Sequence, residues 1–230
     1  MAAIPPPKRH PYDQWAPDAR ALDLVGDKWT LLIVRDLSSG PRRFVELQRV
    51  LPGISTEQLR SRLNRMVADG LLTRQRYREV PPRVDYELTK RSRELLPVLG
   101  ALAHWGYDWA WTAPREGEAI DIGAILRIAP GMASPPANQS GTAELTVTRP
   151  DGTVWHYALT VARGTVTIAE APAPDADACI AGSERDWIEA MRPDGDRDVL
   201  DVGGDERLAK TVLDGVCASA ASTARRLRTA

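Results

Sequence analysis

Residues 53–70 read Gly53-Ile-Ser-Thr-Glu-Gln-Leu-Arg-Ser-Arg-Leu-Asn-Arg-Met-Val-Ala-Asp-Gly70, and they carry the signals of one amphipathic helix. Ser55, followed three residues later by Gln58, is a capping-box pattern. Gly70 suits the position just beyond the helix end. The polar face carries arginines, and the apolar residues share the opposite face at i, i+4, i+7 and i+8: Leu59, Leu63, Met66 and Val67.

A basic hairpin is predicted directly after this helix. Arginines alternate at positions 74, 76 and 78, which places them on one face of a strand, and the run ends at Pro81-Pro82. In the returning strand Val84, Tyr86 and Leu88 share the face that we expect to pack on the helices. A basic helix followed by a basic hairpin is typical of a winged helix-turn-helix, in which the helix enters the major groove of DNA.

Further helices are expected on both sides of this pair. Capping residues, helical spacing of apolar residues and proline positions place them at 17–26, at 28–39 with Asp27 as cap, at 43–50, and from Thr89 onward with a bend at Pro97.

Charge differs between the two halves of the chain. The 230 residues have a formal net charge of −1. Residues 1–115 hold 19 Lys and Arg against 13 Asp and Glu, a net of +6, whereas residues 116–230 hold 11 against 18, a net of −7. A basic first half is compatible with nucleic-acid binding. Taken alone, it is also compatible with ordinary fluctuation of charge along a chain.

Composition points to a globular protein that does not contact membranes. Hydrophobic residues make up 43% and charged residues 27%, no apolar run approaches the ~20 residues of a membrane span, and no signal-peptide core is visible. We therefore expect a cytoplasmic protein with residues 1–16 as a flexible arm. Cys179 and Cys217 lack metal-ligand spacing, and we expect both to be small buried hydrophobes rather than a disulfide.

The pattern changes after a linker expected at residues 113–117. Strands at 142–148 and 154–161 flank Pro150-Asp-Gly152, a strong hairpin signal. Further strands are expected at 165–169 and 178–180, with helices at 120–128, 183–191 and 205–221. The predicted fold is α+β: a winged-helix DNA-binding and dimerisation domain at 17–112, a smaller α/β sheet-and-helix domain at 118–224, and a tail at 225–230.

Five blocks of sequence resemble the HxlR-type winged-helix regulators, in the same order, over roughly residues 12–107. They are residues 21–37, 40–44, 51–55, 68–72 and 81–89, the last reading Pro81-Pro-Arg-Val-Asp-Tyr-Glu-Leu-Thr89. The resemblance implies a homodimer that pairs through its first and last helices and binds palindromic operators. Many members carry a cysteine just before the first helix. This chain has Ala16 there, so thiol sensing at that position is not expected.

The second half resembles, in layout, the sterol-carrier-protein-like domain that is appended to some relatives. The supporting segments are residues 141–161, residues 178–183 leading to Trp187, and residues 202–209. This resemblance implies a curved sheet covered by helices, often with an apolar cavity.

Different side chains are expected to read bases and to hold phosphates. Glutamine can bind adenine and arginine can bind guanine in a bidentate manner, so contacts to base edges or adjacent phosphates are expected from Thr56, Glu57, Gln58, Ser61 and Arg65. Contacts mainly to phosphate are expected from Lys28, Arg42, Arg43, Arg60, Arg62, Arg74, Arg76 and Arg78. Arginines on a helix would by themselves indicate only solubility; the capping box, hairpin and family blocks favour DNA.

Tryptophan is unusually frequent, with seven residues against a single phenylalanine. Its rigid ring can stack on a flat ligand. Ordinary core packing is the favoured explanation for each residue taken alone, whereas for the set as a whole the lining of a pocket is about as well supported, and Trp29 is expected in the core. The candidates for binding a small ligand are Trp105, Trp109, Trp111, Trp155 and Trp187.

Catalytic and metal-binding signatures are missing from the sequence. The three histidines lie far apart, and Val202-Gly-Gly-Asp lacks the lysine of a phosphate-binding loop. Asp194, Asp196 and Asp198 alternate as in a calcium loop but lack its glutamate, so a solvated turn is expected. We expect no metal and no cofactor, and an enzyme is not favoured.

Three classes of function remain open. The first is a homodimeric DNA-binding transcriptional regulator whose second domain senses a small apolar or aromatic ligand. The second is a regulator-derived protein that binds or converts a small molecule of specialised metabolism and no longer acts on DNA. The third is a module that only binds other proteins.

Overall fold

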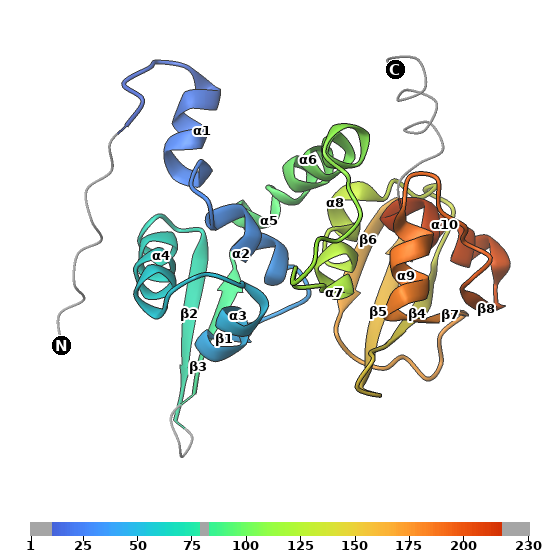
Figure 1. Ribbon diagram of the computed structural model, residues 1–230. Helices are drawn as coiled ribbons and strands as arrows, with labels where there is room; N and C mark the ends of the chain where they lie inside the picture. The colour runs from blue at the N-terminus through green and yellow to red at the C-terminus, as the bar shows by residue number, and fades with distance from the viewer. Residues whose placement is uncertain (1–10, 79–82, 218–230) are drawn as a thin grey trace. The chain divides into compact units, whose positions relative to one another are not determined.

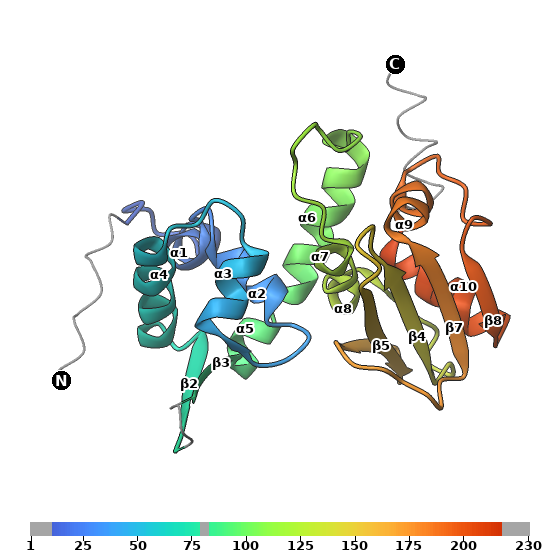
Figure 2. The same cartoon turned by 60° about the horizontal axis from the view of Figure 1, so that its bottom comes forward.

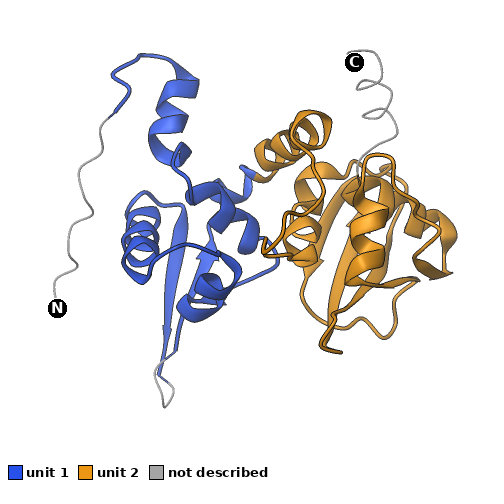
Figure 3. Cartoon of the chain, viewed as in Figure 1, with its two compact units in different colours: residues 1–95 blue, residues 96–230 orange. Residues whose placement is uncertain are grey.

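The computed structural model describes residues 11–78 and 83–217. Residues 1–10 of the arm predicted at 1–16, the turn predicted at 81–82 and the tail predicted at 225–230 therefore lie outside the described residues. The chain divides into two compact units, residues 1–95 and residues 96–230 (Figure 3). The linker predicted from the sequence at 113–117 stays a prediction.

The first unit combines short helices with a small sheet (Figure 1). Its elements are α1 Pro17–Val25, α2 Thr30–Asp36, β1 Arg42–Arg43, α3 Phe44–Val50, α4 Thr56–Ala68, β2 Leu72–Tyr77, β3 Arg83–Leu88 and α5 Lys90–Arg93. The helices agree with the predicted ones except α5, which is only the first part of the helix predicted from Thr89, and the strand β1 was not expected from the sequence.

Capping side chains define where the helices of this unit begin. The Asp27 carboxylate accepts hydrogen bonds from the backbone N–H groups of Trp29 (2.9 Å) and Thr30 (3.1 Å), so it caps the turn that leads into α2, while the N-cap position of the helix itself is Trp29. At α4 the Gln58 N–H donates to the Ser55 hydroxyl at 3.2 Å, and the Ser55 N–H donates to the Gln58 side chain at 3.1 Å. The predicted capping box is therefore present, and it fixes the start of the helix that faces the candidate site.

The sheet of the first unit has the strand order β1-β3-β2, and both pairings are antiparallel. Tyr86 and Leu88 are buried, and the Trp29 ring is also nearly buried, as predicted. They share the core with the apolar face of α4, where Leu59, Leu63 and Met66 are buried.

The second unit is a five-stranded sheet with helices (Figure 1). Its elements are α6 Leu96–Trp109, α7 Ile122–Leu126, α8 Ala129–Met132, β4 Gly141–Thr148, β5 Val154–Ala162, β6 Thr165–Ala169, β7 Ala178–Ser183, α9 Glu184–Met191, β8 Asp201–Gly204 and α10 Glu206–Val216.

The strand order of this sheet is β6-β5-β4-β7-β8, and β5, β4, β7 and β8 lie side by side in Figure 2. Only the β4–β7 pair is parallel among the described strands. Alternate residues such as Leu145, Tyr157 and Ile180 are buried in one cluster with Trp187 of α9 and Val212 of α10. One face of the sheet therefore packs on the helices, as the period-two pattern of its strands predicts.

The helix expected from Thr89 onward is two helices, α5 and α6, separated by Glu94 and Leu95. Pro97 lies in the first turn of α6, where a missing N–H costs nothing. The predicted bend at this proline is therefore a complete break.

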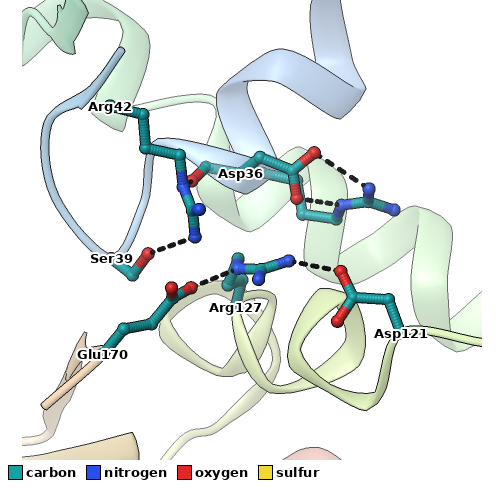
Figure 4. Close-up of polar contacts among 7 residues, drawn as sticks. Asp36, Ser39, Arg42, Asp121, Arg127 and Glu170 are labelled. Carbon is teal, nitrogen blue, oxygen red and sulfur yellow. Dashed lines mark hydrogen bonds and ion pairs between the residues drawn. The ribbon is translucent and has the colours of Figure 1, made fainter. Parts of the chain in front are cut away.

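Arg127 is a fully buried cation in the second unit. Its guanidinium donates to Asp121 at 2.9 Å and to Glu170 at 2.5 Å (Figure 4). These two carboxylates compensate the buried charge and tie the segment before α7 to the residue that follows β6. Within residues 11–78 and 83–217, no helix combines the length and the apolar character that crossing a membrane requires.

Candidate nucleic-acid interface

The exposed face of α4 presents most of the side chains expected to reach bases. Thr56, Glu57, Gln58 and Ser61 are exposed, whereas Arg65 is half-buried. The Thr56 hydroxyl also accepts a hydrogen bond of 2.9 Å from the Gln48 side chain of α3. This bond joins the two helices of the helix-turn-helix at the start of α4.

The β2–β3 hairpin presents the predicted row of arginines. Arg74, Arg76 and Arg78 are exposed, and Arg74 and Arg76 pair across the hairpin with Tyr86 and Val84. Directly paired residues of an antiparallel ladder lie on the same face. Arg74 and Arg76 therefore lie on the face of the hairpin that also carries buried Tyr86.

A concavity of about 300 Å³ lies between α4 and the hairpin. It brings together Arg60 and Arg74, which come from different elements. Its lining residues are Phe44, Arg60, Asn64, Arg74, Val84 and Tyr86. Two guanidinium groups on the rim of one hollow suit an anionic group such as a phosphate.

Two of the arginines expected at phosphates are held inside the first unit instead. The Arg42 guanidinium donates to the Asp36 carbonyl oxygen at 2.6 Å and to the Ser39 hydroxyl at 3.4 Å (Figure 4). Arg62 forms an ion pair of 2.9 Å with Asp27. A contact from either side chain to phosphate competes with these bonds.

The other expected phosphate contacts are more accessible. Lys28 is exposed, with its ammonium 4.8 Å from the centre of the Trp29 ring. Arg60 is exposed beside Glu57, and the two form an ion pair of 2.5 Å. The Arg43 side chain is half-exposed and lies 3.9 Å from Asp85.

The sequence reasoning missed Asp85, whose carboxylate is buried on β3. It is 2% exposed and accepts hydrogen bonds from Arg83 Nε at 2.9 Å and Nη2 at 2.6 Å. These hydrogen bonds, with the positive charges of Arg83 and Arg43, lower the pKa of Asp85 although burial alone would raise it. The spacing Arg83-x-Asp85 on one strand face was the available signal, and the β1–β3 register places Arg43 directly opposite Asp85.

Tyr77 was also missed. Its ring is 44% exposed near the tip of β2, and the Arg83 guanidinium lies 5.2 Å from its centre. The β2–β3 hairpin therefore exposes an apolar ring and a positive charge side by side near its tip.

Three of the five candidate tryptophans share one buried cluster of the second unit, Trp187 within it and Trp111 and Trp155 packed against it, whereas the other two lie on α6. Trp105 and Trp109 are exposed on α6, and Trp155 is half-buried with the Arg149 guanidinium 5.3 Å from its ring centre. Trp187 is fully buried and donates from its indole N–H to the Thr146 carbonyl at 2.9 Å. Trp111 stacks on Tyr107 and lines a cavity of about 780 Å³.

The cysteines and the acidic run have no metal site in the part of the chain that the structure describes. Both cysteines are free thiols. Cys217 is buried as expected, but Cys179 is exposed, because its place on β7 turns the side chain to the opposite face from buried Ala178 and Ile180. In the acidic run the Asp198 N–H donates to the Asp196 carboxylate at 2.9 Å, as in a local turn.

A helix-turn-helix with an exposed second helix, followed directly by a basic antiparallel hairpin, defines a winged helix-turn-helix protein. The model of a family described as HxlR-like helix-turn-helix matches residues 24–113. A curated HTH-type transcriptional regulator of Synechocystis, sll1512, is 44% identical over 40% of this chain and 69% of its own length. YkvN, an HTH-type transcriptional regulator of Bacillus subtilis, is 38% identical over 42% of this chain and 81% of its own length.

A solved structure of a putative MarR-family transcriptional regulator from Porphyromonas gingivalis W83 is 35% identical over 44% of this chain and 99% of that chain, with a TM-score of 0.41. The extent of the curated matches settles the family. The chain belongs to the HxlR-like helix-turn-helix family of transcriptional regulators.

Proposed function

We propose that this protein is a homodimeric, sequence-specific DNA-binding transcriptional regulator of the cytoplasm. The observation that carries the proposal is the exposed polar face of α4 beside the arginines of the β2–β3 hairpin. In this arrangement α4 enters the major groove while the hairpin follows the flanking phosphates.

The accessible residues of these elements divide into two roles. Thr56, Glu57, Gln58, Ser61 and Arg65 contact base edges or the phosphates beside them. The arginines and the lysine expected at phosphates fix the position of the protein along the duplex. Among them, Arg60 and Arg74 line the same concavity and bind one phosphate from its two sides.

The proposed dimer surface is an exposed apolar stripe on α6. Val98, Leu102, Trp105 and Trp109 are 51%, 53%, 57% and 53% exposed, and they recur at i, i+4, i+7 and i+11. This is the spacing of a helix–helix seam, and four large exposed side chains in one row are costly to leave in water. A second copy of the same helix is the occupant that satisfies it, through a twofold contact in which each stripe covers the other.

The second unit is proposed to be the sensor domain, with a sterol-carrier-like layout and a small apolar or aromatic ligand. A five-stranded sheet with helices on one buried face supports the layout. The cavity beside Trp111 supports ligand binding. A ligand that binds one arrangement of the dimer better than another shifts the spacing of the two α4 helices, whose half-sites lie ~34 Å apart on DNA.

The competing proposal is a regulator-derived small-molecule-binding protein that no longer acts on DNA. The same cavity favours it, since ligand binding does not require the α4 face. Retention of a metabolite by a protein with no affinity for DNA, including DNA near its own gene, would support this alternative.

The deciding experiment is genome-wide footprinting with the purified protein, followed by mobility-shift assays on the recovered sites. Arg65→Ala and Arg76→Ala should weaken binding, and Arg207→Ala, an exposed position on α10, is the matched control that should not. The logarithm of the DNA association constant should fall linearly with the logarithm of the salt concentration, with a slope of about −0.9 for each phosphate that the protein neutralises. Wild-type affinity in both variants would show that these residues do not contact DNA.

A further inference from the structure

The cavity of about 780 Å³ in the second unit is formed by two parts of the chain that are distant in sequence, residues 111–114 and residues 185–199. The residues that follow α6, the exposed side of α9 and the loop after α9 all contribute to its wall. The lining residues are Trp111, Thr112, Ala113, Pro114, Arg185, Asp186, Ile188, Glu189, Arg192, Pro193, Asp194 and Val199.

One side of this cavity is a flat, supported aromatic surface. The Trp111 ring is half-buried and stacks on the ring of Tyr107, with ring centres 4.9 Å apart and planes inclined by 27°. Tyr107 is itself 4% exposed, and its hydroxyl donates to the Val216 carbonyl oxygen at 3.2 Å. Trp111 is therefore held on a fixed partner, and Ile188 adds an apolar side chain to the same wall.

Most charged groups of the lining have a hydrogen-bond or ion-pair partner in the second unit. Asp186 accepts hydrogen bonds from the Ser183 N–H (2.8 Å) and hydroxyl (2.6 Å). Glu189 and Asp194 both pair with Arg192, at 3.0 and 3.6 Å. The three carboxylates of the lining thus each have a partner inside the second unit.

Arg185 is the exception within the cavity. Its side chain is exposed, and it has no hydrogen bond or ion pair with any residue in the described ranges 11–78 and 83–217. A guanidinium presents a planar fork of donors that matches a carboxylate in a bidentate manner. The two arginines and three carboxylates of the lining sum to a net charge of −1, and Arg185 is the guanidinium among them that makes no direct ion pair with a described residue. After the hydrogen bonds from Ser183, its charge nevertheless contributes to lowering the pKa of the neighbouring Asp186.

We propose that this cavity binds a planar aromatic molecule with a single carboxylate, its ring lying against Trp111 and its carboxylate paired with Arg185. The inference rests on the proposed sensor function and specifies its ligand class. It also gives the bound ligand a physical link to α6, because the ring that it contacts stacks on Tyr107 of that helix.

The test uses the full-length protein with 2-naphthoate as probe and 2-naphthylmethanol as its uncharged counterpart, both followed by isothermal titration calorimetry. The wild type should bind 2-naphthoate more tightly than the alcohol. Arg185→Ala should weaken 2-naphthoate binding about tenfold, the typical cost of losing a hydrogen bond to a charged group, and should leave the alcohol unaffected. Trp111→Leu should weaken both probes.

Arg207→Ala is the control for removal of an exposed arginine, and circular dichroism checks that Trp111→Leu stays folded. Arg185 is exposed, so its variant tests the proposal even if the tryptophan variant does not fold. No heat of 2-naphthoate binding at millimolar concentration, or equal affinity in wild type and Arg185→Ala, overturns the inference. DNA mobility shifts on the same preparations separate the two proposals: intact DNA binding without probe binding refutes only the ligand class, and the reverse refutes only the DNA-binding function.

Discussion

Gly100 of α6 and Gly131 of α8 meet backbone to backbone. A Cβ added at Gly100 would overlap the carbonyl oxygen of Gly131, and one added at Gly131 would overlap the carbonyl oxygen of Leu96. The two glycines let α6 dock closely on α8. They anchor one side of α6 within the second unit, which leaves the stripe at Val98, Leu102, Trp105 and Trp109 on its exposed side.

Gly100→Ala should destabilise the protein because the new methyl group has no room. Forced overpacking typically costs about 1–3 kcal/mol, measurable as a lower urea midpoint. Gly106→Ala in the same helix is the control: its Cβ meets open space, so the helix should gain about 0.5–1 kcal/mol from the better helix former. A Gly100→Ala variant as stable as the wild type would show that the α6–α8 crossing is not tightly packed.

Trp105→Asp should break the proposed dimer. A carboxylate in the centre of an apolar helix seam must be desolvated, so the dimer dissociation constant should rise at least about tenfold, as sedimentation velocity over a concentration series would show. Val154→Asp places the same charge at a similarly exposed apolar position on β5 and should leave association unchanged. If Trp105→Asp sediments as the wild type does, the α6 stripe is not the subunit contact.

Asp85 should make stability depend on pH in the acid range. Its pKa is lowered mainly by hydrogen bonds from Arg83. A lowered folded-state pKa stabilises the fold at any pH where the unfolded carboxyl is ionised. This contribution disappears as the pH falls from the ordinary value of an aspartate through the folded one.

Asp85→Asn should therefore cost about 1–2 kcal/mol of unfolding free energy at neutral pH, and the gap to the wild type should narrow in acid. Urea titrations at several pH values measure both quantities. Glu87→Gln, on the same strand but paired with Arg93 at a more exposed site, should change stability far less. If the difference in unfolding free energy between the wild type and Asp85→Asn stays constant down to strongly acid pH, Asp85 does not have the lowered pKa assigned to it.

The two cysteines should react at very different rates. Burial raises the pKa of the Cys217 thiol to about 11, and the side chain is 1% exposed, so it holds almost no accessible thiolate at neutral pH. Cys179 is exposed. A chromogenic disulfide reagent should titrate one thiol quickly in the native protein and both after denaturation. Cys179→Ser should remove the fast phase; its persistence in that variant would mean that Cys217 is accessible.

Local signals in the sequence were sufficient for most elements of both units. The Ser55–Gln58 capping box, the Asp27 cap and the Pro150-Asp-Gly152 turn depend on residues a few positions apart, so they are readable without the fold. The two-residue strand β1 has no periodicity of its own and forms because the free edge of β3 is available to it. The strand β8, rich in glycine, carries little strand propensity and likewise depends on its neighbour β7.

The sequence predicted which residues make up the candidate DNA site, but not which of their side chains are left unengaged by the rest of the fold and can reach DNA. Arg42 and Arg62 look like their neighbours in sequence, yet Asp36 and Asp27 engage them in the folded unit. Conversely, Arg60 and Arg74 meet at one concavity although they belong to different elements.

By itself, the sequence determined the order of helices and strands, the amphipathic face of α4 and the winged-helix class, because caps, turns and hydrophobic periodicity act over a few residues. Only the tertiary structure decided that Asp85 is buried, that Trp187 is core while Trp111 lines a cavity, and that Arg185 makes no direct ion pair there within the described residues. Burial and ion pairing depend on which distant segments come into contact, and that information appears only once the two sheets and their helices have packed.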